Sequence, residues 1–237
     1  MMHDYTRRFL AELLGTFMLV FFGCAAVVMN AFPGANMGIL GVAFAHAIAL
    51  SVAVTATMNI SGGHLNPAVT LGFLAVRRIT LPVAGVHLAA QVVAAGLAAL
   101  ALKVMLPAGV ARVVSYGLPE LNLSVSLAQG IGIEALLTFI LMSAIYGTAV
   151  APTAPRVGGF GIGLTLLFLI LGAGPLTGAA MNPARALGPA LAAGNFTAHA
   201  VYWIGPVLGA LAAAFFWEKL MLGGTMATRN PATVTAD

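Results

Sequence analysis

The hydrophobic positions along the chain form six runs, each about as long as a membrane span: 9–29, 38–59, 81–102, 125–148, 159–176 and 199–220. A helix needs about 20 predominantly apolar residues to cross a hydrocarbon core of about 30 Å. Two further apolar runs, 67–76 and 183–193, have only about ten residues, which corresponds to roughly 15 Å of helix. The pattern therefore predicts an all-α membrane protein with six transmembrane helices and two re-entrant half-helices that each reach half way.

Polar and helix-breaking residues stand directly before each short run, in the motifs Asn66-Pro67-Ala68 and Asn182-Pro183-Ala184. Asparagine is a favoured N-cap and proline is favoured at the first helical position, so both motifs predict helix starts in mid-membrane. Non-helical backbone at that depth must be buried in protein or line a water-filled cavity. We expect residues 60–65 and 176–181 to form such a lining, with carbonyl groups facing the lumen. Two helix N-termini with asparagine amides would repel cations and accept neutral hydrogen-bonding molecules.

The chain repeats itself internally. Glu12, with Thr16-Phe17 after it, recurs as Glu134 with Thr138-Phe139, and each glutamate precedes its motif asparagine by a similar distance, 54 and 48 residues. The repeats cover about 7–104 and 125–220, joined by an external loop at 105–124. Three spans per repeat insert the two halves in opposite orientations, as in the inverted repeats of many transport proteins. Residues 1–222 are thus predicted to form one transmembrane domain.

Composition and charge agree with this architecture. Hydrophobic residues make up 61% of the 237 residues and charged ones 7%, far below the roughly 25% of soluble domains. The basic residues form no patch for nucleic acid; with both termini in the cytoplasm, seven of ten lie on that side, as the positive-inside rule requires. We expect a multi-pass protein of a cell membrane, either a plasma membrane or a bacterial inner membrane, with a disordered cytoplasmic tail at 223–237.

The paired motifs identify a resemblance along residues 7–220. Ser61-Gly62-Gly63-His64-Leu65 followed by the first motif, and the second motif followed by Arg185, resemble the two signatures of the aquaporin or major intrinsic protein family. This resemblance implies a right-handed helical barrel and a passive channel that conducts water while excluding protons and ions. It also implies a homotetramer in the lipid bilayer whose partners are water and small neutral solutes.

The resemblance further implies which residues select the solute. In the family, an arginine at the position of Arg185 marks the external constriction, and the other constriction positions fall on His46, Ile170 and Ala179. This combination resembles the plant vacuolar-membrane branch, whose members pass ammonia, and often urea or hydrogen peroxide, besides water. Glu12 and Glu134 are expected to support the re-entrant loops by accepting hydrogen bonds from backbone N–H groups. His64 belongs to the first signature and is expected to support its loop or to sense pH.

Other interpretations remain open for these residues. His46 could be an ordinary buried histidine, Arg185 could form a structural ion pair, and His87 could serve only packing. The family's glycerol-type members carry an aspartate after the motif arginine, where this chain has Ala186. Ile170 and Ala179 nevertheless make the constriction less aromatic than in strict water channels, so small polyols are an alternative solute. A non-conducting adhesive protein of the same fold is a further alternative.

Catalysis and ion-coupled transport are not expected. The spans contain isolated glutamates and histidines without metal-ligand or nucleophile–base spacing, so we expect no enzyme activity, no cofactor and no metal site. A coupled transporter would need acidic residues at its substrate site, whereas both intramembrane glutamates are assigned to a structural task.

Overall fold

Six long helices form the body of the protein. The structure is a computed structural model that describes residues 2–155 and 157–223, so the predicted tail lies outside the described residues from position 224 onward. The six are α1 (Met2–Asn30), α2 (Gly38–Ser61), α4 (Leu81–Met105), α6 (Leu127–Ile145), α7 (Phe160–Thr177) and α9 (Val201–Phe216). Two of them continue into π-helical turns, α6 into η2 (Tyr146–Val150) and α9 into η3 (Trp217–Met221). All six are long and apolar enough to cross a membrane, which confirms the predicted spans.

The two short helices are confirmed as α3 (Pro67–Ala75) and α8 (Pro183–Ala193). Each begins at the proline of its motif, directly after an asparagine N-cap. The left-handed glycines Gly62 and Gly178 end the preceding long helices, α2 and α7, at φ 95° and 79°. Glycine adopts this conformation without a Cβ penalty, so the chain can turn back into the membrane there.

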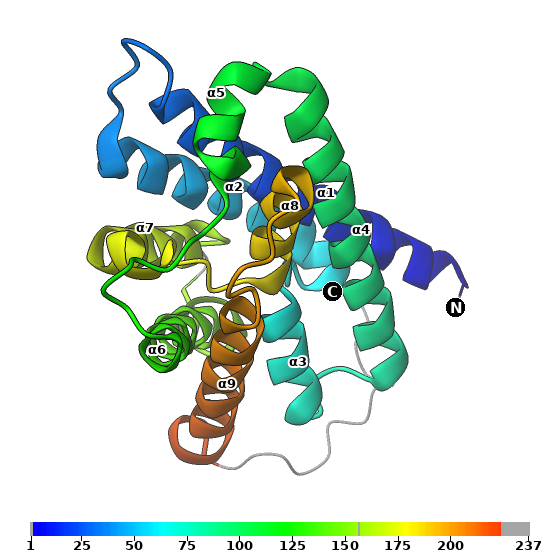
Figure 1. Cartoon of the computed structure of the whole chain (residues 1–237). Helices are drawn as coiled ribbons and strands as arrows, with labels where there is room; N and C mark the ends of the chain where they lie inside the picture. Colours follow the sequence, from blue (N-terminus) through cyan, green and yellow to red (C-terminus); the bar gives the residue numbers. More distant parts are fainter. Residues whose placement is uncertain (1, 156, 224–237) are drawn as a thin grey trace.

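Each short helix packs mainly against a long helix of the other repeat. The α8 helix lies against α4, and the α3 helix lies against α9. Figure 1 shows α8 near the centre of the bundle, with α3 between α4 and α9. The two halves of the chain therefore interlock. Because an even number of helices crosses the membrane, α1 begins and α9 ends on the same face, called the terminal face below.

Glycines allow the closest helix crossings. A Cβ on Gly163 of α7 would lie 1.9 Å from the Ser51 hydroxyl oxygen of α2, and a Cβ on Gly209 of α9 would lie 2.1 Å from the Ala135 carbonyl oxygen of α6. Both distances are far below van der Waals contact. These crossings thus require a residue without a side chain, as small residues do in many membrane helix pairs.

The connector 105–124 differs from the simple loop expected from the sequence. It contains the short helix α5 (Ala108–Val113) and the 3₁₀ turn η1 (Ser115–Gly117). Tyr116 and Gly117 have left-handed backbones, with φ 55° and 81°. A Cβ on Gly117 would lie 2.9 Å from Cys24 Cα. The connector therefore presses against α1, and it places the Gly117 carbonyl inside the bundle.

Candidate functional site

Asn66 and Asn182 cap the two short helices. Both have extended backbones, with φ −155° and −149°. The Asn66 Oδ1 atom accepts a hydrogen bond from the Ala68 amide at 2.9 Å. The Asn182 Oδ1 atom accepts from the Ala184 and Arg185 amides at 2.9 and 3.3 Å. Each side-chain oxygen is thereby committed to its own helix, and each side-chain NH₂ group points away from it.

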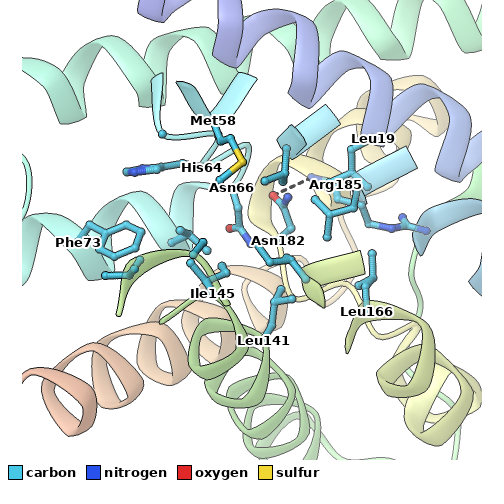
Figure 2. A pocket seen from close by; sticks show the side chains of 18 of the residues that line it. Leu19, Met58, His64, Asn66, Phe73, Leu141, Ile145, Leu166, Asn182 and Arg185 are labelled. Atoms are coloured by element: carbon cyan, nitrogen blue, oxygen red, sulfur yellow. Dashed lines mark hydrogen bonds between the residues drawn. The ribbon is translucent and has the colours of Figure 1, made fainter. Parts of the chain in front are cut away.

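The two caps also hold the two loops together. Asn66 Nδ2 donates to the Met181 carbonyl and Asn182 Nδ2 donates to the Leu65 carbonyl, each at 2.8 Å. Leu65 and Met181 adopt left-handed backbones, with φ 51° and 52°. These two carbonyls are therefore already engaged by the asparagine side chains. An amide NH₂ has two N–H groups, so one on each asparagine remains for the cavity that both line (Figure 2).

Glu134 holds the second loop from behind. Its Oε1 atom accepts from the Thr177 hydroxyl at 2.7 Å and the Ala180 amide at 3.0 Å, and its Oε2 atom accepts from the Met181 amide at 2.7 Å. The side chain is fully buried. Its geometry is that of a loop support, and no carboxylate oxygen is left without a donor.

Glu12 occupies the same place in the first repeat. Its oxygens accept from the Ser61 hydroxyl at 2.7 Å and from the His64 and Leu65 amides at 2.9 and 2.7 Å. Gln91 of α4 adds a fourth donor at 2.8 Å. The two glutamates thus meet equivalent donors, since Ser61 and Thr177 hold the same place in the repeat.

The first loop carries a larger polar cluster than the second. His64 Nδ1 lies 3.1 Å from the Thr70 hydroxyl and 3.3 Å from His87 Nδ1, and Gln91 Nε2 lies 3.0 Å from the same hydroxyl. The sequence predicts only a packing or interfacial role for His87, and it does not single out Gln91. Their spacing of one helical turn inside an apolar span was the available signal.

Two cavities meet at His46 and Arg185. The first, of about 360 Å³, runs past the two asparagines and ends on the terminal face, where Arg78, Ile79, Ala149 and Val150 line it; this end is called the Arg78 mouth. The second, of about 300 Å³, lies on the opposite side and is lined by Gly117, Ile170 and Gly178 among others. His46 and Arg185 are the two residues that line both. They therefore stand between the two cavities.

Arg185 is held by neutral acceptors. Its Nη1 donates to the Gly117 carbonyl at 2.9 Å and its Nη2 lies 3.2 Å from His46 Nε2. Within the described residues the ion pairs are Arg8–Asp4 and Arg78–Glu218, so no carboxylate there pairs with Arg185. The guanidinium has five donors, two of which are engaged. Its charge and its other donors are therefore available at the junction of the cavities.

The hydrogen bonds of His46 fix its tautomer. His46 Nδ1 lies 2.9 Å from the Val42 carbonyl, which can only accept, so Nδ1 carries the hydrogen. Nε2 is then the acceptor for Arg185. Both ring nitrogens of His46 therefore already have protein partners, and the ring offers a passing solute neither a free donor nor a free acceptor. His46 instead orients the arginine.

The other two constriction candidates lie on either side of this junction. Ile170 of α7 lines the second cavity, and Ala179 of the second loop lines the first. Both are small or apolar and offer no polar side-chain atom. The polar side chains at the junction are therefore those of His46 and Arg185.

These features define a class of protein. Two helix N-termini and an arginine that pairs with no carboxylate among the described residues direct positive potential into the path that the two cavities outline, which disfavours cations. Hydrogen-bond donors along the same path suit neutral polar molecules. The arrangement is that of a membrane channel built from an inverted repeat.

The chain belongs to the major intrinsic protein family, whose model matches residues 2–217. It is 40% identical to the maize (Zea mays) aquaporin TIP4-4, over 91% of this chain and 87% of that protein. It is 37% identical to the rice (Oryza sativa subsp. japonica) aquaporin NIP1-3, over 92% of this chain and 74% of that protein. The protein is thus an aquaporin-type integral membrane protein, a passive channel for water and small solutes.

A solved structure supports the fold. The aquaglyceroporin from Plasmodium falciparum superimposes with a TM-score of 0.80, covering 92% of this chain and 97% of that one, at 24% sequence identity. The likeness concerns the arrangement of the helices alone.

Cys24 lies behind the junction of the cavities. The thiol is fully buried on α1, lines neither cavity, and lies 3.9 Å from the Gly117 carbonyl oxygen that holds Arg185. Since a mercurial must reach the thiol to react, we expect weak inhibition of water flux, measured by stopped-flow light scattering on proteoliposomes. The control is Cys24→Ser. Strong block, whether it survives this substitution or is abolished by it, would contradict the prediction.

Proposed function

We propose that this channel passes ammonia as well as water, and that His46, Ile170, Ala179 and Arg185 form its selective constriction. The observation that carries the proposal is the junction of the two cavities at His46 and Arg185. Water and ammonia are similar in size, so a channel must distinguish them by hydrogen bonding rather than by diameter. The partners offered at this junction therefore decide the selectivity.

The two hydrogen bonds that Arg185 makes to the protein favour the passage of ammonia. Water has two O–H donors and two lone pairs, whereas ammonia has three N–H donors and one lone pair, so ammonia gains less from guanidinium donors and more from acceptors. His46 and Gly117 together remove two of the arginine donors from the path. The loop 178–180 lines both cavities beside this point, with Gly178 on one side and Ala179 and Ala180 on the other. We propose its backbone carbonyls as the acceptors for ammonia, with Ile170 offering no competing polar group.

The test compares two solutes in the same proteoliposomes. We expect the wild type to accelerate both osmotic water flow and internal alkalinisation in an inward ammonia gradient, with proton conductance at background. His46→Phe releases the second arginine donor, so ammonia flux should fall relative to water flux by about fivefold, the equivalent of roughly 1 kcal/mol for one hydrogen bond. Adding Ile170→His should not restore it.

The outcomes separate the parts of the proposal. Alkalinisation no faster than in empty vesicles, with normal water flux, would exclude ammonia as a solute. Normal ammonia flux in His46→Phe would remove only the role of His46.

Urea, hydrogen peroxide and glycerol should be tested in the same assay, because the apolar wall at Ile170 and Ala179 also favours a channel for small polyols. Normal insertion without any flux would instead favour an adhesive protein.

The placement in the membrane is also part of the proposal. We infer that the terminal face is cytoplasmic, because Arg7, Arg8, Arg77, Arg78 and Lys219 belong to it; Arg156 and Arg229 lie outside the described residues.

We propose that the protein resides in a plasma membrane or a bacterial inner membrane. We also propose that residues 1–222 form one transmembrane domain and that four chains assemble into a homotetramer with one pore per chain. Cross-linking in native membranes tests the tetramer. We propose no enzyme activity and no cofactor.

A further inference from the structure

A second arginine lines the path at its other end. Arg78 follows α3 and lines the Arg78 mouth together with Ile79, Ala149 and Val150. Its Nε atom donates to Glu218 Oε1, forming an ion pair with a glutamate 140 positions later in the chain. The two arginines of the path thus differ in kind, because only Arg78 has an acidic partner among the described residues.

Glu218 is fixed from a second direction. The hydroxyl of Tyr146 donates to the same Oε1 atom at 2.9 Å, and the guanidinium carbon of Arg78 lies 5.5 Å from the centre of the Tyr146 ring. Tyr146 is itself fully buried and stacks on Trp217 with a centroid distance of 5.7 Å. The carboxylate therefore has little freedom to move, and it determines where the guanidinium lies.

This cluster connects to the wall of the first cavity. The ring of Phe73 lies 5.5 Å from that of Tyr146 and 4.9 Å from that of His64. Both Phe73 and His64 line the cavity, at the end away from Arg185 in Figure 2. Arg78 thus lies in the wall of the path, and its ion pair with Glu218 joins the segment after α3 to η3, which continues α9.

The two partners are unequally exposed. The Arg78 side chain is 36% exposed, whereas that of Glu218 is 6% exposed. An arginine side chain is long and has many rotamers. Without its acidic partner, the Arg78 guanidinium is free to leave the wall, and the adjoining space is the mouth of the cavity. The hydrated Arg78 guanidinium would narrow the opening there and add positive charge to it.

We infer that Glu218 is a positioning residue that holds Arg78 against the wall of the Arg78 mouth, and that Arg78 controls passage through this mouth. The inference rests on the channel function and adds a second control point far from His46 and Arg185. Arg78 impedes the solute only when it leaves the wall, and Glu218 acts through the position of Arg78. A purely structural brace between α9 and the segment after α3 is the competing explanation.

The experiment is a double-substitution cycle read as water permeability per inserted channel. We expect Glu218→Gln to lower it several-fold, because the amide no longer neutralises the guanidinium and replaces a charge-assisted hydrogen bond with a weaker neutral one. Arg78→Ala alone should conduct at least as well as the wild type. The combination of Arg78→Ala with Glu218→Gln should restore the permeability lost in Glu218→Gln. A brace predicts the opposite, since losing both partners cannot repair a broken contact.

A matched control is present on the same face. Asp4 and Arg8 form an exposed ion pair on α1, at 2.8 Å, and neither residue lines either of the two cavities described above. Asp4→Asn makes the same change of charge on the terminal face and should leave permeability unchanged. Loss in Asp4→Asn equal to that in Glu218→Gln would overturn the inference, because it would be an effect of surface charge.

The remaining outcomes are also decisive. Wild-type permeability in Glu218→Gln, or a double variant as slow as Glu218→Gln, would overturn the inference. If Glu218→Gln fails to insert, Arg78→Ala decides alone, and a permeability well below that of the wild type would overturn it. Wild-type vesicles no faster than empty ones would contradict the channel function itself, which is a distinguishable result.

Discussion

Replacing Glu134 with alanine is expected to abolish the folded channel. The Thr177 hydroxyl and the Ala180 and Met181 amides would all lose their acceptor inside the membrane. Each unpaired buried group costs about 1–3 kcal/mol, so the two amides alone cost roughly 2–6 kcal/mol. That is a large part of the roughly 5–15 kcal/mol by which a typical protein is stable. Melting of the detergent-solubilised protein should shift strongly downward, and water flux should fall to background.

The effect should reach the pore by a defined route. Met181 donates to Glu134 and accepts from Asn66, so a displaced Met181 also frees the first cap. Glu134→Gln should be milder, because one oxygen remains as an acceptor. Glu120 is exposed, and Glu120→Ala serves as the control that should behave as the wild type. Unchanged melting and flux in Glu134→Ala would show that the loop does not depend on this carboxylate.

Replacing Gly209 with valine is expected to separate α6 from α9. The new Cβ would lie 2.1 Å from the Ala135 carbonyl oxygen and 2.9 Å from the Phe139 amide nitrogen, and backbone atoms cannot move aside as a flexible side chain can. Overpacking costs about 1–3 kcal/mol even where side chains can adjust, so a backbone clash should cost more. The amount of folded protein recovered after detergent extraction measures the effect, and we expect almost none.

Gly132 on α6 supplies the matched control. It is exposed, and a Cβ there would meet nothing within 4 Å. Gly132→Val should therefore leave folding and water flux intact. Equal losses in both variants would show that valine harms these helices in general, for instance through insertion, rather than at the contact of α9 with α6.

Much of the fold could be predicted from the sequence, because the controlling physics is local. The cost of an unpaired backbone group in hydrocarbon makes each long apolar run a helix. Asn66-Pro67 and Asn182-Pro183 set the starts of α3 and α8 because a cap and a proline act on the adjacent turn. The two motifs, the two glutamates and the inverted repeat were all visible as spacings along one chain.

The partners across the bundle were decided only by the tertiary structure. The sequence does not show that α3 packs on α9 and α8 on α4, that each cap donates to the other loop, or that the connector brings the Gly117 carbonyl to Arg185. Nor does it show that the two ring nitrogens of His46 hydrogen-bond to Val42 and Arg185, or that Arg78 forms an ion pair with Glu218. Spacing along a helix determines which residues lie on the same face of that helix. A hydrogen bond between residues more than 100 positions apart depends on how whole helices cross, and the direction of each donor depends on which acceptor the packing places within about 3 Å.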